Sequence, residues 1–330
     1  MIMRNEDGFV KRLQQRGLNR EQVDFCLGTV REFEQHLEAK GASLDSVTVD
    51  LLKRYVALLM EEGKNSMDRL IALARYCGFA KKNDLFIYLV SLVGAADVLP
   101  GIGERLAAVA GEDVRKRVFK GIKMPPLGSP QEDYPPLTQK IVERMEAELP
   151  IETCREVLTW NYHKVPVEAF KEMKERFEKA KSIDEFLADE HKRFVEELAG
   201  YMKEGRLWYE QEITPAVLEF VKNNPEVNLG VRRGNKIYAL KFPYAPEQYL
   251  KEKDPRMKRF YACHCQLART AVRDGKPNIS STFCYCSAGY EKIRFDVIFG
   301  EPVEIELLES VLKGDPQCRF SITIPKGKMK

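Results

Sequence analysis

Five prolines within fourteen residues interrupt the chain at 123–136, in the run KMPPLGSPQEDYPP. Proline fixes φ and has no amide donor, so neither a helix nor a central strand can pass through such a run. A chain of 330 residues is long enough for two or three domains. We therefore predict one domain over residues 1–122, a linker over 123–136 and a second domain over 137–330.

The first domain is predicted to be entirely helical. Apolar residues recur every three or four positions over 23–37 and again over 51–59, and a glycine follows each run. This is the period of a helix that buries one face. Two more helices are expected over 68–76 and 84–92. Their order resembles the core-binding domain of phage-integrase-type recombinases, which implies a similar fold but no recombinase activity.

Gly101 and Gly103 flank an apolar residue in the segment 98–111, VLPGIGERLAAVAG. This pattern resembles a helix-hairpin-helix element, whose turn offers backbone amides to a DNA phosphate. It also fits an ordinary turn between helices, where both glycines adopt positive φ. We favour the ordinary turn and expect no strong nucleic-acid binding, because the net charge is only +3.

The second domain is predicted to combine helices with an antiparallel sheet, so the whole chain is expected to be α+β. Ser182 followed by Glu185 fits a capping box at the start of a helix. β-forming residues on both sides of the Arg-Arg-Gly-Asn run at 232–235 predict a hairpin. Helices are expected over 137–149, 166–180 and 182–205, and further strands over 292–300 and 318–325.

The eight cysteines are unevenly distributed. Cys26, Cys77 and Cys154 lie singly in helical segments, whereas five others fall within 56 residues. The chain starts MIMRNEDGFVK, without an apolar signal segment, so we expect a cytoplasmic protein with reduced thiols. Clustered cysteines then indicate a metal site or catalysis before disulfides. The five are Cys263, Cys265, Cys284, Cys286 and Cys318.

Two Cys-X-Cys pairs followed by Cys318 predict a metal site. Residues i and i+2 of an extended segment point the same way, and four thiolates suit zinc or, as an alternative, an iron–sulfur cluster. His264 is a further possible ligand. A catalytic or redox thiol remains open, because Lys258, Arg259 and Arg269 lie near the first pair. Purely structural thiols also remain open, because free cysteine is often buried.

The run 287–322 resembles the end of the 4-vinyl reductase-type small-molecule-binding domain. That module occurs in a chlorophyll-biosynthesis protein and in the sensor regions of phenol-responsive activators. The resemblance implies an α+β ligand pocket with zinc beside it in the phenol sensors, and Cys318 corresponds to one zinc ligand. Ile305 and Ser310 stand where those sensors have cysteine. The matching positions are Gly289-Tyr290, Phe299 to Val303, Glu306 to Ser310 and Gly314 to Arg319.

A cysteine-rich turn, a helix and then GDPQCRF at 314–320 are also similar to the 2-aminothiazoline-4-carboxylate hydrolase family. This resemblance implies that a cysteine or a metal-bound water opens a small ring. Cys284 or Cys286 would be the nucleophile, because both precede a helix expected near Ser287. His163, in the loop TWNYHKVP, is a candidate ligand or general base, although packing explains most such histidines.

These observations favour a small-molecule-binding protein with a cysteine-ligated zinc site. A hydrolase of a small heterocycle and a ligand-responsive regulator associated with DNA are the alternatives. The expected partner is a small molecule. No membrane contact is expected, because the longest apolar run, 86–102, is interrupted by Ser91 and Asp97 and falls short of the ~20 residues that a span needs.

Overall fold

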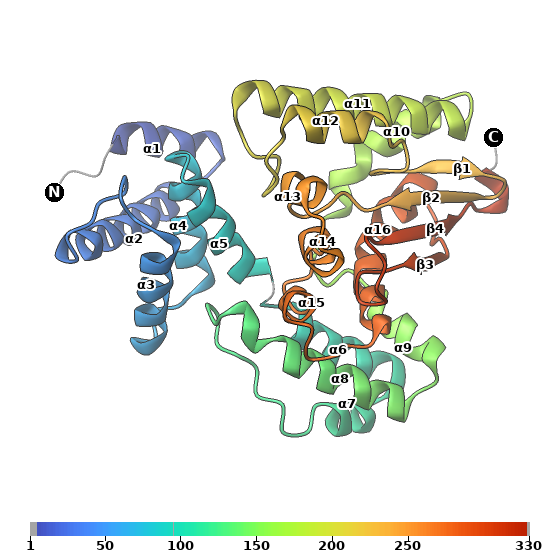
Figure 1. The fold of residues 1–330 in the computed structure, drawn as a ribbon, viewed down its shortest axis with the longest axis horizontal. Helices are drawn as coiled ribbons and strands as arrows, with labels where there is room; N and C mark the ends of the chain where they lie inside the picture. Colours follow the sequence, from blue (N-terminus) through green and yellow to red (C-terminus); the bar gives the residue numbers. More distant parts are fainter. Residues whose placement is uncertain (1–4, 95, 329–330) are drawn as a thin grey trace. The chain divides into compact units, whose positions relative to one another are not determined.

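The computed structural model describes residues 5–94 and 96–328 and divides into two compact units (Figure 1). The first comprises Met1–Ala96 and Met124–Gln131, and the second comprises Asp97–Lys123 and Glu132–Lys330. This division differs from the predicted boundary at 123–136. The helices over 97–123 belong to the second unit, and the middle of the proline-rich segment belongs to the first.

The first unit is helical, as predicted. Side-chain caps begin three of its helices: Asn19 forms a capping box with Gln22, and Thr48 and Ser66 each accept a bond from a backbone amide. Side chains such as Phe33 bury one face of each helix in a shared core. The helices are α1 (Glu6–Gln15), α2 (Arg20–Ala39), α3 (Val49–Glu61), α4 (Met67–Phe79) and α5 (Asn83–Gly94).

Residues 124–131 of the proline-rich segment belong to the first unit, and three of them show how it is held there. The Leu127 carbonyl accepts a 2.8 Å hydrogen bond from Asn65 Nδ2. Gly128 has φ +97°, and a Cβ there would come within 2.9 Å of Val56. Ser129 is buried. Residues 127–129 therefore pack close to α3 although they lie outside every helix and strand.

The predicted turn at Gly101 and Gly103 is wrong in both of its interpretations. Both glycines lie inside a continuous helix, α6 (Val98–Ala110), and neither has a positive φ. A Cβ at Gly101 would lie 3.0 Å from the Tyr162 ring, and one at Gly103 would lie 3.3 Å from Phe119. The glycines therefore permit close packing of aromatic rings and present no hairpin to DNA. The neighbouring helices are α7 (Glu112–Val118), α8 (Pro135–Glu148) and α9 (Ile151–Leu158).

Within the described residues, one helical stretch is long and apolar enough to cross a membrane, Asn83–Ala110, which contains α5 and α6. Inside the protein, 41% of its most apolar window is buried. Leu89 of α5 lies in the core of the first unit, and Ile102 and Leu106 of α6 are also fully buried. Packing inside the protein therefore accounts for part of this apolar surface.

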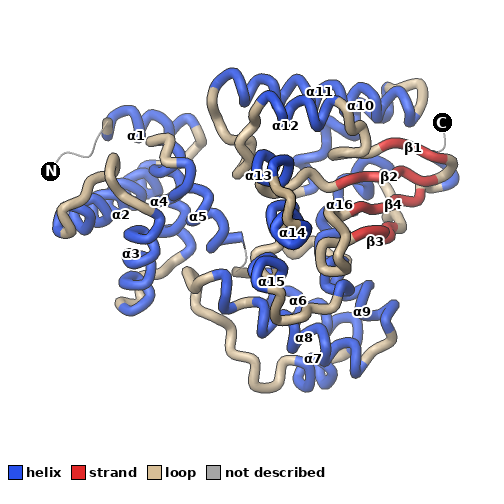
Figure 2. Tube along the Cα trace, viewed as in Figure 1, coloured by secondary structure: helices blue, strands red, loops and turns tan. Residues whose placement is uncertain are grey.

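The second unit holds one antiparallel sheet, which confirms the α+β prediction (Figure 2). The strand order is β1-β2-β4-β3, so the strand latest in the sequence is central. Ile237 pairs with Ile322 and Ala239 with Phe320, and all four side chains are buried on one face. The strands are β1 (Val231–Arg233), β2 (Lys236–Leu240), β3 (Ile305–Glu309) and β4 (Arg319–Thr323).

Helix α16 (Tyr285–Phe299) packs against β3 and β4. Its neighbour in sequence, α15 (Arg269–Asp274), follows the first cysteine pair. The other helices are α10 (Lys171–Lys179), α11 (Ile183–Glu204), α12 (Pro215–Lys222), α13 (Pro246–Lys251) and α14 (Pro255–Ala262). Short 3₁₀ turns are η1 (Gln131–Asp133), η2 (Val167–Phe170), η3 (Ser281–Cys284) and η4 (Lys326–Lys328).

Two of the three β predictions are confirmed. The run 232–235 forms the β1–β2 hairpin, and 318–325 contains β4. The prediction for 292–300 is wrong, because these residues form the second half of α16. Their apolar side chains bury at helical spacing against the sheet, and this packing overrides β propensity. Ser182 caps α11 by accepting from the Glu185 amide at 3.1 Å, whereas the Glu185 carboxylate accepts from the Lys181 amide.

Candidate functional site

The five clustered cysteines lie at the ends of elements in the second unit. Cys263 follows the last turn of α14, and the carbonyl of Cys265 accepts from the Ala268 and Arg269 amides at the start of α15. Cys284 is the N-cap of α16, Cys286 lies in its first turn, and Cys318 directly precedes β4. Three segments that are separate in the sequence therefore supply thiols at element ends.

The fold brings these thiols near one another, and none forms a disulfide. The side chains of Cys284 and Cys318 are hydrogen-bonded to each other, although 34 positions separate them. Cys263 is an electrostatic neighbour of Cys318 and of Cys284. Cys265 interacts in the same way with Cys263 and Cys286. The five residues thus form one continuous thiol cluster.

Burial keeps most of the cluster protonated. It raises the pKa of the Cys263 thiol to about 11 and that of Cys286 to about 12. The hydrogen bond between Cys284 and Cys318 raises the pKa of Cys284 and lowers the pKa of Cys318. The two thiols therefore titrate as a pair, in which Cys318 loses its proton before Cys284. Neither predicted nucleophile, Cys284 or Cys286, has the lowered pKa of an activated thiol.

No three His, Cys, Asp or Glu side chains are placed to hold one metal ion in the part of the chain that the structure describes. The thiols are neighbours, but they do not yet surround one point. Protonated thiols have no charge to attract a cation, and metal binding must first remove their protons. Ligation by this cluster would therefore require the cysteine side chains to rotate toward a common centre.

His264 lies between Cys263 and Cys265 in the sequence, and one of its ring nitrogens is hydrogen-bonded to a backbone carbonyl. Its Nε2 lies 2.6 Å from the Phe242 carbonyl oxygen, and its ring meets Tyr244 edge to face. A carbonyl can only accept, so Nε2 carries the proton and Nδ1 keeps its lone pair. Burial lowers the pKa of His264 to about 3, with a smaller effect from the Lys241 charge. A neutral histidine bonded to a carbonyl in this way has the form of a metal ligand.

Lys241, which sequence reasoning missed, supplies a positive charge to the cluster. Its backbone amide donates to the Cys318 carbonyl at 2.9 Å, and its Nζ lies 2.6 Å from Ser287 Oγ. The ammonium also lies 3.9 Å from Glu291 and over the Tyr290 ring. Its charge lowers the pKa of Cys286 against the larger effect of burial. No local motif marks this lysine, because pairing of β2 with β4 positions it.

His163 belongs to the same region. It lies in the loop between α9 and η2, and its ring meets Tyr290 edge to face at 5.7 Å. Burial, and then the Lys241 charge, lower its pKa, so it is neutral at pH 7. The structure thus brings His163 toward His264, which is its electrostatic neighbour.

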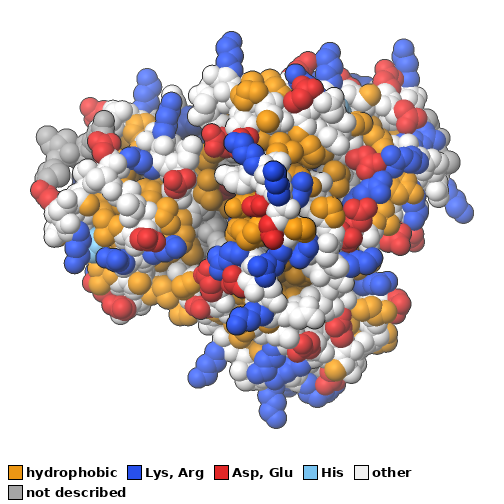
Figure 3. Space-filling view, in the orientation of Figure 1, with side chains coloured by type: hydrophobic (Ala, Val, Ile, Leu, Met, Phe, Trp, Pro, Cys, Tyr) orange, Lys and Arg blue, Asp and Glu red, His pale blue; other side chains and the backbone are white. Residues whose placement is uncertain are grey.

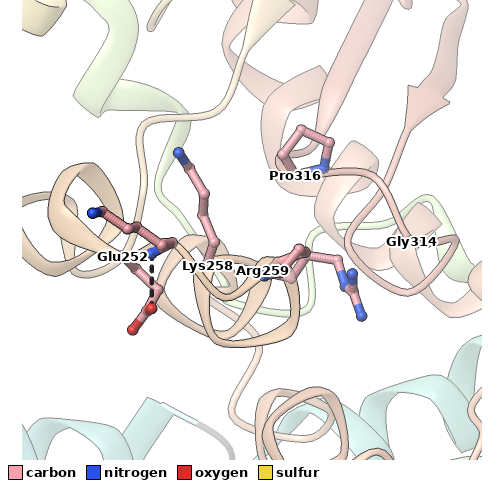
Figure 4. Close-up of a pocket in the computed structure, with 7 residues that line it drawn as sticks. Glu252, Lys258, Arg259, Gly314 and Pro316 are labelled. Atoms are coloured by element: carbon pink, nitrogen blue, oxygen red, sulfur yellow. Dashed lines mark hydrogen bonds between the residues drawn. The ribbon is translucent and has the colours of Figure 1, made fainter.

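A surface depression of about 350 Å³ lies between α14 and the β3–β4 loop (Figure 4). Lys258 and Arg259 line one side, and Gly314 and Pro316 line the other. Glu252, at its edge, uses its carboxylate to accept from the Lys253 amide. Lys and Arg side chains gather along α13–α15 on this face (Figure 3). The two segments that line the depression also carry thiols of the cluster, since Cys263 directly follows α14 and Cys318 lies two residues after Pro316.

The model of a family of unknown function, DUF6144, matches residues 247–329. The match covers about a quarter of the chain and contains all five clustered cysteines. No curated protein and no solved structure matches the chain.

Proposed function

We propose that the second unit binds a small molecule beside a metal ion held by its clustered cysteines, with zinc as the first candidate and an iron–sulfur cluster as the second. The main support for this proposal is that three segments bring five cysteines together. At their centre, the side chains of Cys284 and Cys318 are hydrogen-bonded to each other. Cytosolic thiols stay reduced and available for metal, so we also propose a cytoplasmic location.

The charges around the cluster suit this proposal. Zinc bound by four thiolates carries a net charge of −2, which is costly to bury without cations nearby. Lys241 and Arg269 both influence the pKa of Cys263, and their side chains are mostly buried. With the thiols protonated, Arg269 has no ion-paired carboxylate among the described residues, whereas Lys241 already lies 3.9 Å from Glu291. Metal binding with loss of the thiol protons would supply the missing negative charge.

The resemblance of 287–322 to the 4-vinyl reductase-type domain gains support at one position. Ser310 stands where phenol-responsive members have cysteine, and here its hydroxyl hydrogen-bonds the Cys284 side chain. Ser310 is also fully buried. Cys284 therefore places a sulfur beside the position at which the resemblance expects one, from a different part of the chain.

The alternatives receive less support. A thiol hydrolase needs an activated cysteine, whereas the pKa of Cys284 and that of Cys286 are both raised. A hydrolase that uses metal-bound water would share the proposed site. A DNA-associated regulator loses its helix-hairpin-helix motif, because Gly101 and Gly103 lie inside α6.

Metal analysis of the full chain tests the proposal. Protein prepared anaerobically, without chelator or affinity tag, should contain about one metal equivalent per chain. The double variant C263S/C265S should lose that metal and melt at a lower temperature, since the metal stabilises only the folded state. Brown absorbance would indicate iron–sulfur, and colourless zinc protein would support the first candidate.

A matched control is available in the first unit. The double variant C26S/C77S removes the same number of thiols from buried helical positions far from the cluster in sequence. It should retain the full metal content. Wild-type protein that holds less than half an equivalent of any metal, or equal metal loss in both double variants, would contradict the proposal.

A further inference from the structure

Arg269 is a buried cation without a counter-ion. Its side chain is only 6% exposed, and its guanidinium lies between the rings of Tyr244 at 4.0 Å and Phe260 at 4.4 Å. It forms no ion pair with an Asp or Glu among the described residues. One nitrogen reaches the Phe260 carbonyl at a long 3.5 Å, and Nε is buried without a partner.

Gln266, three residues earlier, leaves a complementary atom free. Its Oε1 is buried and has no hydrogen-bond partner among the described residues. Gln266 and Arg269 both hydrogen-bond the Tyr244 hydroxyl and lower the pKa of that tyrosine against the larger effect of burial. One unused donor and one unused acceptor thus belong to two side chains that meet at the same hydroxyl.

Burying these unpaired polar atoms lowers the stability of the fold unless a bound group pairs with them. Each unpaired buried polar group costs about 1–3 kcal/mol, and a charged one costs more. Stacking on two rings offsets part of the cost of the guanidinium but satisfies neither free atom. A bound group that accepts from Arg269 and donates to Gln266 would satisfy both.

The remaining charges determine which kind of group fits. Arg269 and Lys241 both act on His264, which is itself neutral. Glu210 is the acidic neighbour of Arg269, but it lies beyond ion-pair distance, and burial raises its pKa. Cations therefore dominate here, so the accepting part of the ligand is anionic, and Gln266 Oε1 requires a hydroxyl or amine hydrogen beside it.

We propose that Arg269 and Gln266 bind a small oxyanion that carries a hydroxyl, such as a hydroxycarboxylate or hydrogen phosphate. This inference rests on the proposed small-molecule function and names its ligand class. Arg269 also influences Cys263, so the oxyanion binds beside the thiol cluster.

Paired probes separate the two contacts. Calorimetric titration of the full chain with glycolate against acetate, and with hydrogen phosphate against sulfate, compares anions with and without the hydroxyl hydrogen. The hydroxyl-bearing probe of each pair should bind about tenfold more tightly, which corresponds to about 1.4 kcal/mol. If hydrogen phosphate binds and glycolate does not, the ligand carries a phosphate group. If glycolate binds and hydrogen phosphate does not, the ligand carries a carboxylate. Failure of all four probes to bind, or equal binding within both pairs, would overturn the inference.

Variants assign the contacts to residues. Arg269→Met should weaken every probe at least tenfold, while Gln266→Leu should remove the preference for the hydroxyl and keep anion binding. Arg256→Met, which removes the same charge from an exposed position of the neighbouring α14, is the control and should bind like wild type. Probe affinities in Arg269→Met that equal those of wild type would contradict the proposal.

Stability distinguishes a ligand contact from a structural one. Without ligand, Arg269→Met should melt no lower than wild type, because it removes an unpaired buried charge. A large loss of stability in this variant, with no loss of preference in Gln266→Leu, would mean that the residues serve the fold alone. Oxyanion binding by wild-type protein shown to hold no metal would overturn the metal proposal and leave this one standing.

Discussion

The interiors of the two units differ in what they bury. In the described part of the first unit, the buried side chains are apolar except for Thr29, Ser91 and Ser129. The second unit also buries three charged residues, Glu190, Arg269 and Glu291. Burying a charge costs several kcal/mol unless partners offset it. The first interior is therefore built almost entirely by apolar packing, whereas the second must offset the cost of three buried charges.

Two of the three buried charges in the second unit are matched. Glu190 pairs with Arg176 through both carboxylate oxygens. Glu291 lies 2.5 Å from Arg294 and 3.9 Å from Lys241. Arg269 is the exception among the described residues, and its charge acts on the thiol cluster. The buried charge that distinguishes the second unit from the first, and that has no ion-pair partner among the described residues, therefore lies near the clustered cysteines.

Truncating one core phenylalanine in each unit tests whether the two interiors are independent. Phe33→Ala in the first unit and Phe320→Ala in the second should each cost about 3–5 kcal/mol, because both side chains are fully buried. Both tryptophans, Trp160 and Trp208, lie in the second unit, so their fluorescence follows that unit alone. Circular dichroism follows the helices of both.

Phe33→Ala should lower the circular-dichroism transition and leave the fluorescence transition in place. Phe320→Ala should shift the fluorescence transition. If Phe33→Ala shifts the circular-dichroism and fluorescence transitions equally, the two units unfold together. Their interiors are then not independent.

Alkaline pH should weaken the second unit more than the first in metal-free, reduced protein. A thiol whose pKa is raised on folding stabilises the fold below its ordinary pKa of about 9 and loses that contribution as pH rises toward its folded value. The first unit has one such thiol with a large shift, Cys77 at about 12, and the second has Cys263 at about 11 and Cys286 at about 12. Each contributes a loss of about 1.4 kcal/mol per pH unit.

Denaturant titrations at pH 8 and pH 10, followed by fluorescence and by circular dichroism, measure this difference. Zinc should abolish the loss in the second unit, since bound thiolates no longer titrate. A stability of the second unit that stays constant between the two pH values would contradict the burial of these thiols.

A glycine-to-alanine change should stabilise the fold at Gly28 of the first unit and destabilise it at Gly289 of the second. Gly28, in α2, has open space where a Cβ would be, so Gly28→Ala should stabilise the first unit by about 0.5–1 kcal/mol. Gly289, in α16, would place a Cβ 2.6 Å from the Trp160 carbonyl oxygen and closer still to its amide nitrogen. Backbone cannot yield as a side chain can, so Gly289→Ala should cost about 1–3 kcal/mol.

Thermal melting measures both glycine variants, and Trp160 fluorescence should shift in Gly289→Ala only. Gly200→Ala, in α11 of the second unit, also meets no neighbouring atom and should behave like Gly28→Ala. Destabilisation of all three variants alike would show that close packing at α16 is not the cause.

Limited proteolysis gives the smallest effect, a difference in cleavage rate within the proline-rich segment. The segment 123–136 should be cut first, as its backbone has few regular hydrogen bonds. Cleavage should fall outside 127–129, where Leu127 is hydrogen-bonded and Gly128 and Ser129 are buried. Mass spectrometry of the first fragments locates the cut, and a first cut within α2 or α11 would contradict this order.

The sequence predicted features that depend on neighbours along the chain. The helices of the first unit, the cap at Ser182 and the β1–β2 hairpin all follow from local periodicity or turn residues. It failed at 292–300, where β-forming residues bury their side chains as a helix against the sheet. The spacing of the cysteines predicted that they form a cluster, but it did not predict the hydrogen bond between Cys284 and Cys318. Lys241 was missed because only strand pairing brings it to Cys318.

The order of the sheet has a consequence for synthesis on the ribosome. β4 is the last strand to be made, yet it pairs with β2 on one side and with β3 on the other. Helices of the first unit can form while the chain is still emerging, whereas the sheet must wait until residue 323 has left the exit tunnel. Cys318 emerges with the same strand. A nascent chain therefore exposes its first four clustered thiols before the fifth has been made.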